Sequence, residues 1–231
     1  QSGCTDDSVL TAATAEALLD GHDYAAAYRR FGRRHPRAGY GGNFIHWIFE
    51  DAAGPYNSWG NGSAMRVSPV GWWFDTLEAT LDEAARSAAV THNHPEGIKG
   101  AQAVAAAIFL ARQGNSKDQI RQQLTTRFGY DLDRRASDIR RSYSFDVSCQ
   151  GSVPEALICF LDASDFEQAV RLAILLGGDA DTQACIAGSV AEAFFGGVPD
   201  EIKQETLRRL PPDLKKVVER FRATLRRSSK D

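Results

Sequence analysis

The segment GGDADTQACIAGSVAEAFFGG spans residues 177–197 and carries the clearest structural information in the chain. Its opening glycines indicate the end of one helix, and the acidic and hydroxyl residues that follow can cap the next. That next helix carries small residues on one side, namely Ala184, Ala187, Gly188 and Ala191. Small side chains allow a helix backbone to approach a neighbour closely. The segment therefore predicts closely packed helices.

Helical spacing continues on both sides of this segment. Residues 166–174 and 214–225 each hold an apolar stripe whose members recur every three or four positions. Residues 101–112 are apolar on nearly every side, which predicts a buried central helix. Alternating strand patterns are short, and β-branched residues are sparse. We therefore predict an all-α fold of about a dozen helices in one domain over residues 1–231.

Capping residues predict where several helices begin. Asp75, Ser116 and Ser164 each precede a helical stretch, and their side-chain oxygens can accept hydrogen bonds from the first free backbone N–H groups. Pro154 is expected to open a helix that continues to Leu161, because proline is tolerated in a first helical turn.

The composition argues against several classes of function. The chain has 231 residues, with 27 Lys and Arg against 30 Asp and Glu, and a net charge of −3. This balance does not favour broad binding to nucleic acid or to anionic membranes. No apolar run approaches the roughly 20 residues of a membrane span, and the four cysteines show no Cys-x-x-Cys spacing. We expect a cytoplasmic protein with no membrane partner.

Residues 54–72 break the helical pattern with four glycines, two prolines and three aromatic residues. A long polar loop inside a helical domain is more often a binding loop than a filler, which favours a ligand site here. Within it, the glycines around Asn61, Gly62 and Ser63 permit close backbone approach to a phosphate. The Gly-Lys-Ser/Thr ending of a P-loop is missing.

Two acidic motifs stand at predicted helix starts. Residues 5–7 read Thr-Asp-Asp, and residues 179–182 read Asp-Ala-Asp-Thr. Taken singly, each is explained as a helix cap whose acids suit the helix dipole. Taken together, four carboxylates in one core region would repel one another unless cations were bound. Oxygen-only ligands select Mg²⁺, Mn²⁺ or Ca²⁺ rather than zinc, and two such motifs suit a two-metal site.

The segment Thr-His-Asn-His-Pro at residues 91–95 has two interpretations. A His-x-His pair suggests zinc, but no third soft ligand lies near it in the sequence. His92 is then either a satisfied histidine in a loop that enters a helix or a hydrogen-bonding partner for a polar ligand.

Five segments, in this order, resemble the ADP-ribosylglycohydrolase family. They are TDDS (5–8), GNGSAMR (60–66), THNHP (91–95), SYSFDVSCQGSVPEAL (142–157) and the segment quoted first. The reading YNSWGNGSAMRVSP is similar to the compact bacterial subgroup. The resemblance implies an all-α orthogonal multi-helix domain with a binuclear Mg²⁺ or Mn²⁺ centre. The implied metal ligands are Thr5, Asp6, Asp7, Asp179, Asp181 and Thr182. The implied ADP-ribose contacts are Asn61, Gly62, Ser63, His92 and Phe145.

The sequence departs from the family pattern at its beginning. Family members carry a GAxxGDAxG helix and an acidic residue ahead of the Thr-Asp-Asp motif, whereas this sequence starts at Gln1, after that helix. We expect the catalytic acid of the family to lie upstream of residue 1. Asp6 and Asp7 are the candidates for proton transfer within the sequence.

The resemblance implies a hydrolase that cleaves the bond between ADP-ribose and an acceptor and so reverses ADP-ribosylation. Its partners would be an ADP-ribosylated protein or another ADP-ribosyl substrate, with ADP-ribose as product, and nucleic acid only where it is the modified acceptor. One alternative is a catalytically silent member that binds ADP-ribose or serves a structural role. Without the resemblance, a helical interaction protein whose acids are only caps remains open.

Overall fold

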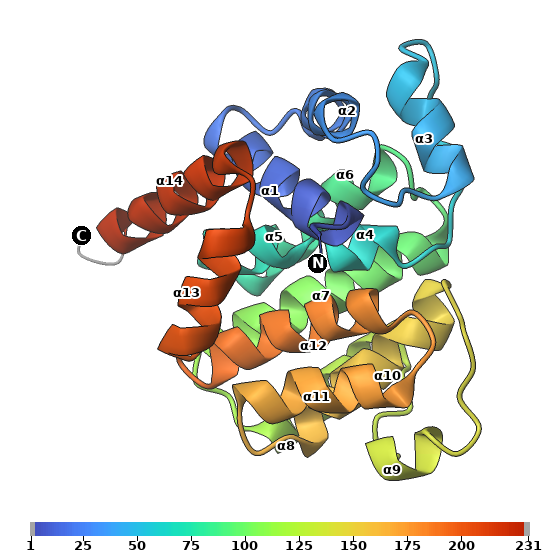
Figure 1. Ribbon diagram of the computed structural model, residues 1–231. Helices are drawn as coiled ribbons and strands as arrows, with labels where there is room; N and C mark the ends of the chain where they lie inside the picture. Colours follow the sequence, from blue (N-terminus) through green and yellow to red (C-terminus); the bar gives the residue numbers. More distant parts are fainter. Residues whose placement is uncertain (1–2, 229–231) are drawn as a thin grey trace.

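Helices make up the fold of residues 3–228, which are the residues described by this computed structural model (Figure 1). Within that range fourteen helices form, and extended backbone pairs only at an isolated antiparallel bridge between Gly60 and Ser148. The prediction of an all-α fold is confirmed. The helices are α1 (Asp6–Leu19), α2 (Tyr24–Arg34), α3 (Gly42–Phe49), α4 (Gly62–Met65), α5 (Ser68–Trp73), α6 (Leu77–Ala89), α7 (Pro95–Arg112), α8 (Lys117–Phe128), α9 (Ala136–Ile139), α10 (Cys149–Asp162), α11 (Phe166–Leu176), α12 (Ala180–Phe194), α13 (Asp200–Arg209) and α14 (Pro212–Ser228).

Helix α7 runs through the middle of the molecule, and α4, α5, α6, α8, α10 and α12 all pack against it (Figure 1). Pro95 takes its first position, where the missing N–H removes no helical hydrogen bond. The His94 side chain caps the helix by accepting from the Glu96 N–H. Every residue at positions 103–111 is buried, so the predicted buried central helix is confirmed.

Helices α11 and α12 lie against each other through small residues. A Cβ atom at Gly188 would lie 3.3 Å from Val170 Cγ2, so the α12 backbone comes very close to α11. Ala187 and Ala191 on the same helix are buried. The predicted small-residue side of α12 therefore allows the two backbones to approach closely.

The C-terminal apolar stripe packs as predicted. Leu214, Val217 and Phe221 are buried, and α14 contacts α1. Phe221 stacks on Trp73, with 5.4 Å between ring centroids, and so also ties α14 to α5.

Two helices begin at the predicted residues, Leu77 and Phe166, but their predicted cap residues are wrong by one position. Helix α6 is capped by Thr76 rather than Asp75, and α11 by Asp165 rather than Ser164. In each case the residue immediately before the helix has the extended backbone that a cap needs. Ser116 is confirmed, since it forms a reciprocal capping box with Gln119 at the start of α8.

Helix α10 begins earlier than predicted. Ser148 caps it by accepting from the Gly151 N–H, and Cys149 is its first residue. Pro154 therefore lies inside the helix rather than at its opening. The ring removes only one backbone donor, while the buried apolar residues around it hold the helix in place.

The prediction of one long loop over residues 54–72 is wrong. Residues 54–61 and the two residues 66–67 stay outside helices, and α4 and α5 occupy the rest. No helix among residues 3–228 is both long enough and apolar enough to cross a membrane.

Candidate functional site

The first acidic motif opens helix α1. Thr5 is its N-cap by backbone conformation, but its side chain caps nothing. The hydroxyl instead donates to Asp7 Oδ2 at 2.8 Å. Asp7 is buried, and its other oxygen, Oδ1, accepts no hydrogen bond. The simple capping interpretation of this motif is therefore insufficient, because a buried carboxylate oxygen is left unpaired.

The second acidic motif opens helix α12. Gly177 and Gly178 both have positive φ, a conformation that glycine adopts without strain, and they turn the chain from α11 into α12. Asp179 is the N-cap residue, yet its side chain makes no capping hydrogen bond. Its Oδ2 instead accepts from Asn61 Nδ2 at 2.8 Å. Thr182 is buried and Asp181 is exposed.

Helix α4 joins the two motifs. It contacts both α1 and α12, and Figure 1 shows the start of α1 beside α4 in the middle of the molecule. The Met65 carbonyl at the end of α4 accepts from Thr11 Oγ1 of α1 and from Cys185 Sγ of α12. Side chains from both ends of the sequence are thereby held around the loop that carries Asn61.

Burial and mutual repulsion perturb the acids. Burial, together with the charges of Asp7, Asp181 and Asp179, raises the pKa of Asp6 to about 7. Burial and the charges of Asp181 and Asp179 raise the pKa of Asp7 to about 6, although the Thr5 hydroxyl opposes the shift. Burial also raises the pKa of Asp179, against the hydrogen bond from Asn61. The four carboxylates predicted to hold metal are therefore electrostatically coupled.

All the predicted ligands offer oxygen atoms, and the unpaired Asp7 Oδ1 is the kind of atom that a hard cation would satisfy. Within residues 3–228, no three His, Cys, Asp or Glu side chains form a group that could hold an ion as they stand.

The loop before α4 is fixed from several sides. Asn61 is buried, and its backbone N–H donates to the Val147 carbonyl at 2.7 Å. Ser63 Oγ donates to the Gly97 carbonyl at 2.7 Å. A Cβ atom at Gly62 would lie 3.1 Å from His92 Nε2, so glycine is what allows the histidine ring to lie against the loop. The structure thus brings Asn61, Gly62, Ser63 and His92 together.

His92 is buried and makes a 2.8 Å hydrogen bond through Nδ1 to Thr91 Oγ1. Burial lowers its pKa well below the ordinary value, and the charge of Arg66 lowers it further, so the ring is neutral at physiological pH. One ring nitrogen is therefore satisfied within the protein, while Nε2 faces the Gly60–Gly62 turn. The interpretation of His92 as a satisfied histidine holds for Nδ1. Its role as a hydrogen-bonding partner for a polar ligand stays a prediction, which falls on Nε2.

Phe145 lies on the loop before α10 and is 68% exposed. Val147, two residues further along the chain, is also exposed, as is Trp59 on a separate loop that the Gly60–Ser148 bridge joins to this one. Phe145 is available for contact with a ligand, but it packs against no predicted site residue.

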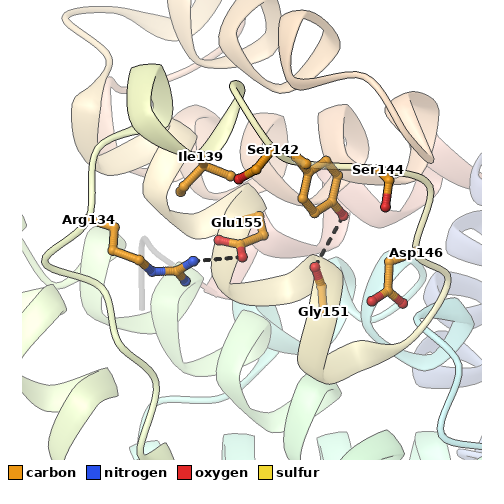
Figure 2. A pocket seen from close by; sticks show the side chains of 8 residues that line it. Arg134, Ile139, Ser142, Ser144, Asp146, Gly151 and Glu155 are labelled. Atoms are coloured by element: carbon orange, nitrogen blue, oxygen red, sulfur yellow. Dashed lines mark hydrogen bonds and ion pairs between the residues drawn. The ribbon is translucent and has the colours of Figure 1, made fainter.

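A cavity of about 280 Å³ opens beside the same loop (Figure 2). None of the predicted metal or ADP-ribose residues lines it. Tyr143 connects it to the acidic motif, because the ring comes within 2.8 Å of where a Cβ of Gly178 would be. The Tyr143 hydroxyl donates to the Gly151 carbonyl at 3.1 Å and accepts from Gln183 Nε2 at 2.6 Å. The lining residues are Arg134, Ile139, Ser142, Tyr143, Ser144, Asp146, Gly151 and Glu155.

Sequence reasoning gave no role to Tyr143, Arg66 or Thr91. All three lie inside motifs that carry the family resemblance, but only the folded structure shows what they contact.

Comparison with known proteins identifies the family. The family model for ADP-ribosylglycohydrolases matches residues 2–230, and the chain therefore belongs to this family. Human ADP-ribosylhydrolase ARH3 is 26% identical to this chain over 87% of it and 73% of the human protein. ADP-ribosylarginine hydrolase Tri1 of Pseudomonas putida is 29% identical over 62% of this chain and 40% of Tri1.

A solved structure gives the same result for the fold. An ADP-ribosylglycohydrolase-related protein complex superposes with a TM-score of 0.71 and 27% identity, covering 92% of this chain and 78% of the matched chain. The family resemblance and the single helical domain predicted from the sequence are confirmed. Family membership and these relatives indicate an ADP-ribosyl hydrolase.

Proposed function

We propose that this protein hydrolyses the glycosidic bond between ADP-ribose and an acceptor group, at a centre that holds two Mg²⁺ or Mn²⁺ ions. The observation that carries this proposal is that the two acidic motifs lie close enough for their carboxylates to repel one another. Asn61 holds the second motif in place, because its amide donates to Asp179 while its backbone N–H anchors the loop. The residues that would hold the metals are Thr5, Asp6, Asp7, Asp179, Asp181 and Thr182.

Electrostatics support a cationic occupant of this centre. Carboxylates whose pKa values are raised to about 7 and about 6 carry a cost when they ionise together at neutral pH. The unpaired Oδ1 of Asp7 adds a buried acceptor that only a donor or a cation can satisfy. Binding would require some of these side chains to rotate toward one another. When bound, the ions would neutralise the carboxylates and make a coordinated water more acidic.

The protein's own residues would orient the substrate. Asn61 fixes Asp179 through its amide, so it couples the loop to the second acidic motif. Gly62 lets the His92 ring lie against the loop, so Nε2 would be held beside a ligand bound there. Phe145 is exposed on the neighbouring loop and offers a ring face to a base.

Cleavage at the anomeric carbon passes through an oxocarbenium-like state and needs a carboxylate to handle the proton. Within residues 1–231, Asp6 and Asp7 are the candidates for this role, to the extent that metal binding leaves them free.

The substrate class is ADP-ribose attached to an acceptor, which is either a protein side chain or a nucleobase. Arginine-linked ADP-ribose is the first acceptor to test, because the relative Tri1 is named an ADP-ribosylarginine hydrolase. A serine-linked substrate and a nucleobase-linked substrate complete the comparison.

The test is release of free ADP-ribose from this panel with Mg²⁺, with Mn²⁺ and with EDTA. We expect turnover of at least one substrate in the presence of metal and none in EDTA. Asp179→Asn and Asp181→Asn are each expected to abolish turnover while leaving helix content unchanged. Metal-dependent binding of ADP-ribose without release from any substrate would instead support the silent alternative.

A further inference from the structure

Arg66 is a buried cation without a carboxylate partner among the described residues. Its guanidinium is fully buried, and its Nε and Nη1 atoms make no hydrogen bond. It stacks over the ring of Tyr28, with 4.1 Å from Cζ to the ring centroid. Burying a charge in this way is costly. The other contacts of the Arg66 guanidinium must therefore compensate for that cost.

Arg66 Nη2 donates to the Ser87 carbonyl at 3.3 Å, and its other hydrogen bond leads toward His92. Arg66 Nη2 donates to Thr91 Oγ1 at 2.9 Å, and Thr91 Oγ1 lies 2.8 Å from His92 Nδ1. Both Thr91 and His92 are buried. The three side chains form one hydrogen-bonded chain from the protein interior to the loop before α4.

The chemistry of the three groups sets the direction of this chain. A guanidinium only donates, so Thr91 Oγ1 must accept from Arg66. The Thr91 hydroxyl has one hydrogen, and Nδ1 is the acceptor within reach that would satisfy it. If Nδ1 carried the proton instead, a buried hydroxyl would be left without an acceptor, which is unfavourable. The neutral ring therefore carries its hydrogen on Nε2.

The Nε2 atom faces the turn formed by residues 60–62. Cβ atoms built at Gly62 and Gly60 would lie 3.1 Å and 3.6 Å from it. Glycine at both positions keeps side chains away from this nitrogen, and Nε2 makes no hydrogen bond to another described residue. A neutral N–H donor at that place suits a hydroxyl or phosphate oxygen of ADP-ribose.

We infer that Arg66 and Thr91 are positioning residues, which hold His92 as the Nε2–H tautomer so that it donates to an oxygen of ADP-ribose bound at the Gly60–Ser63 loop. The ligand in this inference rests on the proposed function, whereas the tautomer does not.

The direct test is ¹⁵N NMR of the histidine side chains in the full 231-residue chain at neutral pH. The His92 signal is assigned from its loss in His92→Gln. We expect an unprotonated Nδ1 and a protonated Nε2, and we expect Thr91→Val to change the tautomer balance while Thr91→Ser keeps it. A wild-type ring protonated on Nδ1, or on both nitrogens, would overturn the inference whether or not the variants fold.

Calorimetry with ADP-ribose and metal tests the positioning role. Thr91→Val should weaken binding about 3- to 10-fold, the usual effect of one misplaced hydrogen bond, and Thr91→Ser should stay within about twofold. Wild-type affinity in a folded Thr91→Val would overturn the positioning role and leave the proposed function standing. If the wild-type chain bound no ADP-ribose with metal present, both the ligand assignment and the proposed function would fail, and the NMR result would still decide the tautomer.

Discussion

Replacing Asp7 with asparagine should stabilise the metal-free protein while destroying its response to metal. In the native state, burial and neighbouring carboxylates raise the pKa of Asp7 from 3.8 to about 6. A group with a raised acid pKa contributes most stability below its unfolded value, and that stability is lost as pH rises through the folded value. At pH 8 the ionised carboxylate therefore costs about 3 kcal/mol, taking about 1.4 kcal/mol per pKa unit. An amide removes the charge and can still accept from Thr5.

The assay is urea unfolding of wild type and Asp7→Asn at pH 8 and pH 4.5, each with EDTA and with Mn²⁺. In EDTA we expect Asp7→Asn to be more stable by up to about 3 kcal/mol at pH 8 and by much less at pH 4.5. With Mn²⁺ the order should reverse, because only the wild type retains the full ligand set. Asp20→Asn is a matched control on the same helix, since Arg220 lowers the pKa of that exposed carboxyl. A variant less stable than wild type in EDTA at pH 8, or equal stabilisation of both proteins by Mn²⁺, would refute the reasoning.

Three further predictions follow from individual contacts. Asn61→Ala removes the donor to Asp179 and should weaken Mn²⁺ binding about tenfold by calorimetry, whereas Asn61→Asp should weaken it less, because a carboxylate can itself bind the ion. Gly100→Ala places a Cβ 2.8 Å from Cys149 Cβ and should cost about 1–3 kcal/mol in urea unfolding; unchanged stability would mean that α7 and α10 separate freely. Phe145→Ala should weaken ADP-ribose binding without lowering the melting temperature, because the ring is exposed; a lower melting temperature would show a packing role instead.

The sequence predicts the fold best where a helix surface makes only one kind of contact. Residues 101–112 are apolar on nearly every side, as suits a helix with neighbours all around it. The small residues of α12 indicate close approach to α11. The errors lie at boundaries, where neighbouring residues compete for one role. Asp75 and Thr76 can both cap a helix, and only the backbone conformation decides between them.

For the site, the motifs predict which residue types matter but not how they interact. The coupling of the carboxylates depends on α4 bringing α1 to α12, which no local pattern encodes. The hydrogen bonds from Arg66 through Thr91 to His92 join two sequence motifs that lie apart along the chain. From the sequence alone Arg66 is indistinguishable from a surface arginine, whereas in the structure it stacks on Tyr28. For Phe145 the family resemblance implied a contact with ADP-ribose, and the structure shows only that its side chain is exposed to solvent.

Counting bound Mn²⁺ by electron paramagnetic resonance tests the central claim most directly, because the proposal requires both acidic motifs to share one centre. We predict two ions for each wild-type chain, close enough for their spins to couple, and loss of that coupled signal in both Asp7→Asn and Asp179→Asn. Saturable binding that survives both substitutions, or no saturable binding to the folded wild-type chain, would contradict the proposal that these motifs form one metal centre.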